Sequence, residues 1–147
     1  MIKQVLTNSL ISLGAGYACQ FIQSMGQSHY LNDFLKGNLI TLLVALLAIN
    51  SATMGIVLTK VRDLIDKKGE GADCFASTKK EMLLSIKEQL ALIVLSVLLL
   101  TVGGSELVTK DINMSSGYWV LVTGIFVYAM IILYDTAKSV IIIIDHE

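Results

Sequence analysis

The sequence contains no proline and few charged residues. Of its 147 residues, 54% are hydrophobic and 16% are charged, whereas an average soluble domain has roughly 25% charged residues. The absence of proline favours uninterrupted helices, because proline removes a helix hydrogen bond and clashes with the preceding turn. The scarcity of charge excludes a disordered chain and a nucleic-acid-binding protein that depends on bulk basicity, and it argues against a soluble enzyme domain.

The few cysteines and histidines form no recognisable site. Cys19 and Cys74 are far apart and match no CxxC pattern, which excludes a disulfide scaffold and a metal site of that type. His29 falls in a predicted loop, and His146 is next to the last residue of the sequence. Walker, GxSxG and HExxH motifs are also lacking. We therefore predict a protein that is not an enzyme, with no catalytic residue, no cofactor and no bound metal.

Long apolar runs take up much of the sequence. Residues 39–59 carry no charge over 21 residues, and at about 1.5 Å per residue such a helix spans roughly 30 Å of hydrocarbon. Similar runs cover residues 90–108 and 118–134. These patterns predict an all-α integral membrane protein with a single transmembrane domain over residues 1–147.

The N-terminal segment is less apolar, and three interpretations compete for it. Residues 4–32 contain no Asp, Glu, Lys or Arg, but amides and hydroxyls are scattered through them. A signal peptide would need a stronger positive region than Lys3 and a less interrupted apolar core. An interfacial helix usually carries Lys or Arg on its polar face. We favour a fourth span at about residues 5–25.

The distribution of basic residues predicts the orientation. With four spans, nine of the 11 Lys and Arg residues fall in segments 1–4, 60–89 and 135–147. Basic residues concentrate on the cytoplasmic side of membrane proteins, so we expect both termini in the cytoplasm. Residues 60–89 should form a cytoplasmic helical hairpin with a glycine-rich turn at 69–71. The helix after the turn is predicted to begin at a capping box, residues 78–81.

Polar side chains recur at helical spacing along the first predicted span, where they fall on one slowly drifting face. Such a face must meet protein or water, because lipid offers amides and hydroxyls no hydrogen bonds. It would line a water-filled pore formed by several subunits, or it would pack against other helices through hydrogen bonds. The second span offers the same choice. The candidate pore-lining residues are Gln4, Asn8, Ser12, Gly16, Gln20, Gln23, Asn50 and Ser51.

No carboxylate or lysine is predicted to lie deep in a span. Glu106 comes nearest, and we expect it at the outer interface. This absence argues against a proton- or ion-coupled transporter, which typically keeps an ionisable residue at its core. It suits a weakly selective pore, because rings of charged side chains usually impose strong selectivity.

The predicted hairpin is rich in Lys and Arg. Each basic residue near a membrane surface is attracted to anionic lipid by roughly 1 kcal/mol, so topology and the lipid bilayer can account for them. Alternatively, basic residues on both sides of the turn converge in an oligomer and bind a nucleotide or oligonucleotide, with an aromatic ring stacked on a base. The candidate ligand-binding residues are Arg62, Lys67, Lys68, Phe75, Lys79 and Lys80.

This plan resembles the small channel-forming membrane effectors of bacterial phage-defence operons, and the Hailong-type effector is the nearest family. The resemblance rests on the short length, the several spans, the polar-striped helix at residues 4–27 and the basic hairpin at residues 60–87. It covers the whole chain as architecture, and without a diagnostic motif no family residue is carried over. It implies a channel in the bacterial inner (plasma) membrane that is controlled from the cytoplasm by a nucleotide signal.

We expect the protein to act as a homo-oligomeric channel or pore, because four short helices of one chain do not enclose a water path. A tetramer is the first expectation. A non-conducting anchor or accessory subunit for a soluble protein partner is one alternative, and a holin-like lysis protein is another. Ion flux through proteoliposomes, with and without a nucleotide extract, tests the channel against the anchor. Size-graded dye leakage tests for a holin.

Overall fold

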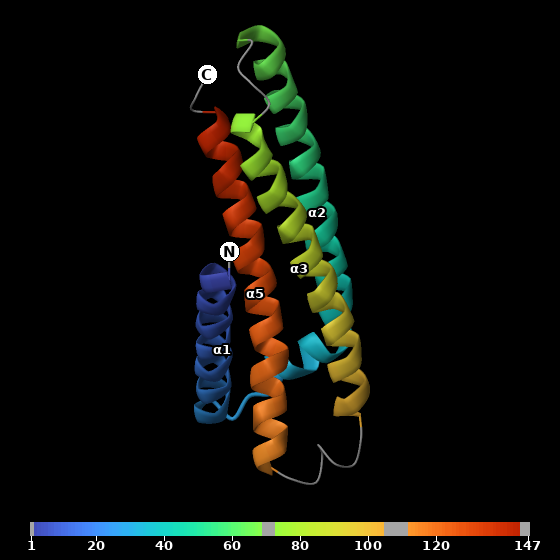
Figure 1. The fold of residues 1–147 in the computed structure, drawn as a ribbon. Coiled ribbons are helices and arrows are strands. Elements are labelled where there is room, and N and C mark those ends of the chain that lie inside the picture. The colour runs from blue at the N-terminus through green and yellow to red at the C-terminus, as the bar shows by residue number, and fades with distance from the viewer. Residues whose placement is uncertain (1, 69–72, 105–111, 145–147) are drawn as a thin grey trace.

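The computed structural model describes residues 2–68, 73–104 and 112–144 of the chain. The regular structure of these residues is entirely helical, which confirms the predicted all-α class. The helices are α1 (Ile2–Met25), α2 (Tyr30–Lys68), α3 (Asp73–Gly103) and α5 (Ile112–Ile144). They run side by side, and α1 covers only part of the length of α5 (Figure 1). We call the end of the molecule at which α2 ends and α3 begins the hairpin end.

In the part of the chain that the structure describes, four helices are long and apolar enough to cross a membrane, as in a multi-pass membrane protein. The four stretches are Lys3–Met25, Tyr30–Lys60, Met82–Gly103 and Met114–Lys138. The second begins nine residues before the predicted start at residue 39, and the third begins eight residues before the predicted start at residue 90. No proline interrupts either helix, so each continues past the apolar run that marked it in the sequence.

The capping box predicted at residues 78–81 is wrong as a helix start. Helix α3 begins at Asp73, so Thr78 lies inside the helix. Residues 73–77 contain neither glycine nor proline, and nothing in them delays the start of a helix. The predicted turn at residues 69–71 and Glu106 lie outside the described residues.

Helix α1 ends in a hydrogen-bonded cap. The backbone N–H of Ser28 donates to the carbonyl of Gln23 at 2.9 Å, and the N–H of Gln27 donates to the carbonyl of Ser24 at 3.3 Å. This is the Schellman pattern, whose cap residue adopts the left-handed conformation. Gln27 occupies that position with φ 48°. Helix α2 then starts at Tyr30, whose N–H donates to the Ser28 hydroxyl at 3.3 Å, so the chain reverses within four residues.

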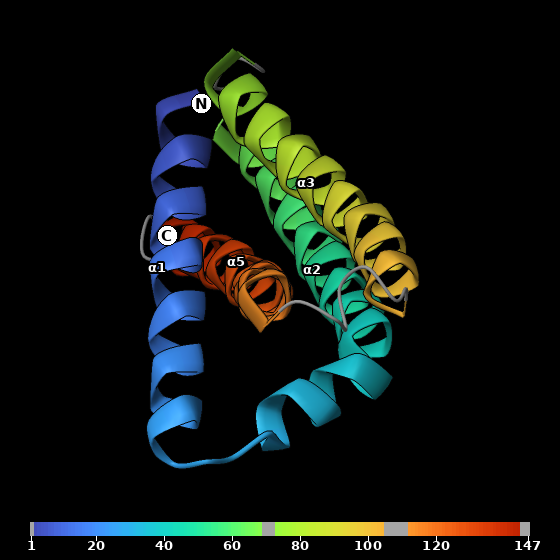
Figure 2. The ribbon, with the colours of Figure 1, turned by 90° about the horizontal axis from the view of Figure 1, so that it is seen from below.

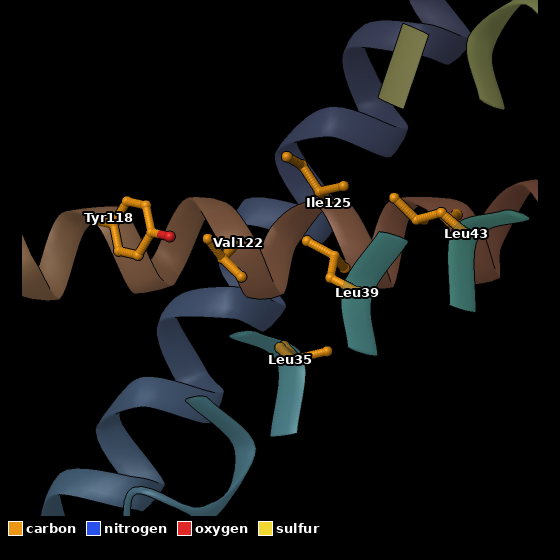
Figure 3. Packing of buried hydrophobic residues seen from close by; sticks show 7 residues of the cluster. Leu35, Leu39, Leu43, Tyr118, Val122 and Ile125 are labelled. Atoms are coloured by element: carbon orange, nitrogen blue, oxygen red, sulfur yellow. The ribbon is translucent and has the colours of Figure 1, made fainter. Parts of the chain in front are cut away.

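The apolar core joins α2 to α5. On α2 its buried members are Leu35, Leu39 and Leu43, which are spaced four residues apart and so share one helix face. Figure 3 shows these three side chains directed at α5, where Tyr118, Val122 and Ile125 face them. The leucine face of α2 packs against the apolar face of α5, and this contact holds the two helices together.

Helix α5 occupies the centre of the fold. Seen from below, it lies between α1 on one side and the α2–α3 pair on the other (Figure 2). Helix α1 packs chiefly against α5, and the two backbones approach each other closely at Gly16 and Gly124. A Cβ added at Gly16 would lie 2.5 Å from the carbonyl oxygen of Val120 and 3.1 Å from the backbone nitrogen of Gly124. Small residues at membrane-helix contacts permit this close approach.

Large apolar side chains are left exposed on the face of α1 that is turned away from α5. Leu6, Leu10, Phe21 and Ile22 are all more than half exposed. An exposed apolar surface of this kind would promote aggregation in water, whereas lipid or a neighbouring subunit covers it without cost. The exposure pattern of α1 therefore agrees with a membrane environment.

Candidate functional site

An open groove of about 400 Å³ lies between α1, α3 and α5. Each of the three helices contributes at least four residues to its lining. The lining residues are Val5, Ser9, Ser12 and Leu13 of α1, Glu88, Ala91, Leu92, Leu95 and Leu99 of α3, and Leu121, Gly124, Ile125 and Tyr128 of α5.

The polarity of the groove changes from one end to the other. Glu88, Tyr128 and Ser9 lie toward the hairpin end, and leucines line the far end. Along α3 the wall runs from Glu88 to Leu99, which corresponds to roughly 16 Å of helix at the usual rise. The groove therefore has one acidic, hydrogen-bonding end and a long apolar remainder.

Toward the hairpin end, Glu88 of α3 accepts a hydrogen bond from α5, and Asp135 of α5 accepts two from α1. The Tyr128 hydroxyl donates to Oε2 of Glu88 at 3.4 Å. The amides of Gln4 and Asn8 donate to Oδ2 of Asp135 at 3.5 and 3.4 Å. These are long hydrogen bonds. We call the cluster of Gln4, Asn8, Ser9, Glu88, Tyr128 and Asp135 the acidic mouth.

The acidic mouth lies inside the apolar helices but close to their ends. Glu88 is six residues from Met82, where its candidate span begins, and Asp135 is three residues from Lys138, where its span ends. At about 1.5 Å per residue these offsets are roughly 9 Å and 5 Å. In a membrane crossed by these four helices, the mouth would therefore lie near the surface rather than at the bilayer centre. The expectation that no carboxylate lies deep in a span is compatible with this depth.

Neither Glu88 nor Asp135 is among the predicted site residues. Glu88 falls within the predicted hairpin at residues 60–89, and Asp135 lies just beyond the predicted span at residues 118–134. Residues 82–89 continue the helix of the third span without a break, so Glu88 belongs to the apolar helix and not to the hairpin. The lack of glycine and proline in residues 82–89 is the sequence signal for this continuity. Nothing in the spacing of either helix indicates that the two carboxylates lie near each other.

The polar stripe of α1 faces α5 and the start of α2. Ser12 and Gly16 are buried against α5. The Gln20 amide donates to Asn32 at 2.7 Å and to Thr123 at 3.3 Å. Gln23 donates to the same Asn32 oxygen at 3.0 Å. These contacts are those that the packing interpretation predicts, and of the stripe only Ser12 also lines the groove.

Asn50 lies inside the chain, between α2 and α3. It is fully buried, and its amide nitrogen donates to the Ser85 hydroxyl at 2.8 Å and to Oε1 of Gln89 at 3.1 Å. Ser85 lies 3.4 Å from the Thr136 hydroxyl, and Thr136 donates to the carbonyl of Ile132 at 3.0 Å. Because Thr136 uses its proton for Ile132, Ser85 must donate to Thr136, and the Asn50 amide must donate to Ser85. In this arrangement Asn50 faces α3 and not a neighbouring subunit.

Ser51 lies on the outer face of α2. It is exposed, and next to it an exposed stripe of small residues follows the helix at steps of three or four. An added Cβ at either glycine of the stripe would meet nothing within 4 Å. We call this set the α2 small-residue face; its members are Gly37, Thr41, Ala45, Ala48, Ala52, Gly55 and Thr59.

The candidate ligand-binding residues of the hairpin are only partly described. Arg62, Lys79 and Lys80 are exposed. The side chains of the other three, Lys67, Lys68 and Phe75, lie outside the described residues, so their convergence stays a prediction. Among the described residues, no group of three or more His, Cys, Asp or Glu side chains is arranged to hold a metal ion. His29 is exposed in the loop before α2.

Comparison of the chain with protein-family models, with curated proteins and with solved structures finds no match.

Proposed function

We propose that the chain is a subunit of a homo-oligomeric membrane channel that prefers cations and conducts along the α1–α3–α5 groove. The observation that carries this proposal is the acidic mouth, where Glu88 and Asp135 lie near each other within candidate spans that hold few charged residues. Ionisable side chains within membrane helices are costly and characteristically mark ion paths. The mouth changes the expected selectivity from weak to cation-preferring.

A neighbouring subunit would close the conduction path. The groove is open rather than enclosed, so one chain by itself would expose a passing ion to lipid. A ring of identical subunits closes such a groove on every member. The α2 small-residue face lies outside the groove and offers a second contact between subunits, because small side chains let the same face of another copy approach closely in a membrane.

The apolar remainder of the groove would serve as the gate. Its lining beyond the mouth includes Leu92, Leu95 and Leu99, and narrow apolar constrictions in channels close by expelling water. The mouth would then concentrate cations on the hairpin side, which we place in the cytoplasm from the excess of Lys and Arg there. Control by a nucleotide at the hairpin remains a prediction of the resemblance to phage-defence effectors.

Ion flux through proteoliposomes that contain the purified chain tests this function. We expect the wild type to conduct K⁺ in preference to Cl⁻. In the double variant Glu88→Gln/Asp135→Asn, the permeability ratio should fall by about tenfold, the effect of losing roughly 1.4 kcal/mol of attraction between the ion and the mouth. The reversal potential in a KCl gradient measures this ratio.

Asp63→Asn is the matched control for the flux experiment, because Asp63 is an exposed carboxylate beyond the candidate span of α2. Its removal should leave the permeability ratio unchanged. A silent wild type would overturn the channel proposal and favour the anchor or accessory subunit. An unchanged ratio in the double variant would remove the mouth from the conduction path, and leakage of large dyes would favour a holin.

Cross-linking on the outer face of α2 tests the assembly. In a background with Cys19 and Cys74 replaced by serine, Ala48→Cys in membranes should give disulfide-linked dimers on mild oxidation, because the α2 small-residue face allows the helices to approach. Ile49→Cys is the control: Ile49 is also exposed, but it projects about 100° away on the helix. Equal cross-linking of the two variants would argue against a specific interface.

A further inference from the structure

The groove has a carboxylate at one end and an apolar wall along the rest. It is therefore complementary to an amphiphile with a cationic head and an apolar tail. We propose that the α1–α3–α5 groove binds a long-chain aliphatic amine, with the alkyl tail along the leucines and the ammonium group beside Glu88. This binding does not depend on conduction, and a chain that passes no ions would still present the same groove.

The dimensions of the groove favour a single unbranched tail. Its volume of about 400 Å³ is near the lower limit of the usual range of ligand pockets, roughly 300–1,000 Å³. The wall extends for roughly 16 Å along α3 from Glu88 to Leu99. An elongated cavity of this size suits one alkyl chain and does not suit a fused ring system or a second tail.

The charge at the mouth selects the head group. Glu88 lines the groove, and none of the lining residues that the structure describes is Lys, Arg or His. A carboxylate in this setting attracts an ammonium group and repels a carboxylate or phosphate head group. Around Glu88, the Tyr128 and Ser9 hydroxyls provide further acceptors for the protons of a primary amine.

The direction of the groove matches the entry of such a molecule from the membrane. The acidic end lies near the surface end of the spans, and the apolar end extends toward the bilayer interior. An amphiphile in the adjoining leaflet already has its head at the surface and its tail inside. It can therefore slide sideways into the groove without reversing its orientation.

Protection of a cysteine placed at the mouth tests the proposal. In the Cys19→Ser/Cys74→Ser background, Ser9→Cys sets a thiol in the groove wall, and Thr7→Cys sets one on the exposed side of the same helix at nearly the same depth. The probes are dodecylamine, dodecanol and dodecanoate, added to proteoliposomes at equal concentrations in the membrane. The readout is the rate of maleimide labelling.

We expect dodecylamine to slow the labelling of Cys at position 9 and to leave position 7 unaffected. Half-protection should need about tenfold less amine than alcohol, the effect of one charge-assisted hydrogen bond, and dodecanoate should protect least. Glu88→Gln should abolish the difference between amine and alcohol, whereas Asp63→Asn should preserve it.

Three results would overturn the site. Equal protection by the three head groups would show that the mouth does not select an ammonium group. Equal protection at positions 7 and 9 would show that the amine perturbs only the bilayer. A head-group preference that survives Glu88→Gln would place the recognition elsewhere. Since labelling does not require ion flux, failure of the channel proposal leaves this experiment interpretable.

Discussion

Replacing Gly16 with leucine is expected to detach α1 from α5. A Cβ at this position would lie 2.5 Å from the carbonyl oxygen of Val120 and 3.1 Å from the nitrogen of Gly124. Both are backbone atoms of α5, so no side-chain rotation relieves the clash and a whole helix must move. Overpacking of this kind costs about 1–3 kcal/mol, and we expect the upper end of that range. The thermal unfolding midpoint in detergent should fall accordingly.

Gly14 provides the control for this substitution. It lies on the same helix two residues away, and an added Cβ there meets nothing within 4 Å. Gly14→Leu should therefore leave the midpoint nearly unchanged. As a second measurement, the half-buried Cys19 of α1 should react faster with a maleimide in Gly16→Leu, in a Cys74→Ser background. Equal effects of the two leucines would contradict the close crossing of α1 and α5.

The second large effect is expected at the buried amide pair Asn50 and Gln89. The two side chains are 0% and 2% exposed and share one hydrogen bond of 3.1 Å. Asn50→Leu removes that bond and leaves the Gln89 amide without a partner from Asn50. A buried polar group without a partner lowers the free energy of unfolding by about 1–3 kcal/mol. For hydrogen bonds between membrane helices, the expected loss is about 1–2 kcal/mol. Unfolding of the purified variant in a denaturing detergent measures the loss.

Adding Gln89→Met to Asn50→Leu should recover most of the lost stability. In the wild type, Oδ1 of Asn50 and Nε2 of Gln89 already lack a hydrogen-bond partner within the described chain. Replacing both amides by apolar side chains of similar size removes these unsatisfied atoms together with the bond. The two substitutions should therefore be strongly non-additive in a double-mutant cycle. A double variant as unstable as the sum of the single variants would contradict this account.

Much of the helical layout could be predicted from composition and periodicity. The apolar run at residues 39–59 lies within α2, and the weaker segment at residues 5–25 lies within α1. The start of α3 was misplaced because a capping-box pattern is a local signal, and the residues before it are equally able to form a helix. The second span begins before residue 39 because the first turns of α2 mix charged and amide side chains with apolar ones, which interrupts the apolar run but not the helix.

The site was less predictable than the helices. The stripe on α1 was recognised as a face that needs a polar partner, and the structure supplies one for Gln20 in Asn32 and Thr123. Asn50, a candidate pore-lining residue, makes the interhelical hydrogen bond that the packing alternative requires. The acidic mouth was missed, because Glu88 and Asp135 belong to different helices and neither has a spacing that indicates the other.

The sequence by itself determined that the chain is helical and apolar, and which side chains share a face of each helix. Those properties follow from the lack of proline, the long uncharged runs and the helical repeat, all of which act along one segment at a time. Only the tertiary structure decided that α5 is central, that the stripe of α1 is turned toward it, and that Glu88 lines one end of a groove close to Asp135. The periodicity of a helix fixes the angle at which a side chain projects, but the helix that lies opposite is chosen by complementary shape. Gly16 against Gly124 is the clearest such fit in the part of the chain that the structure describes.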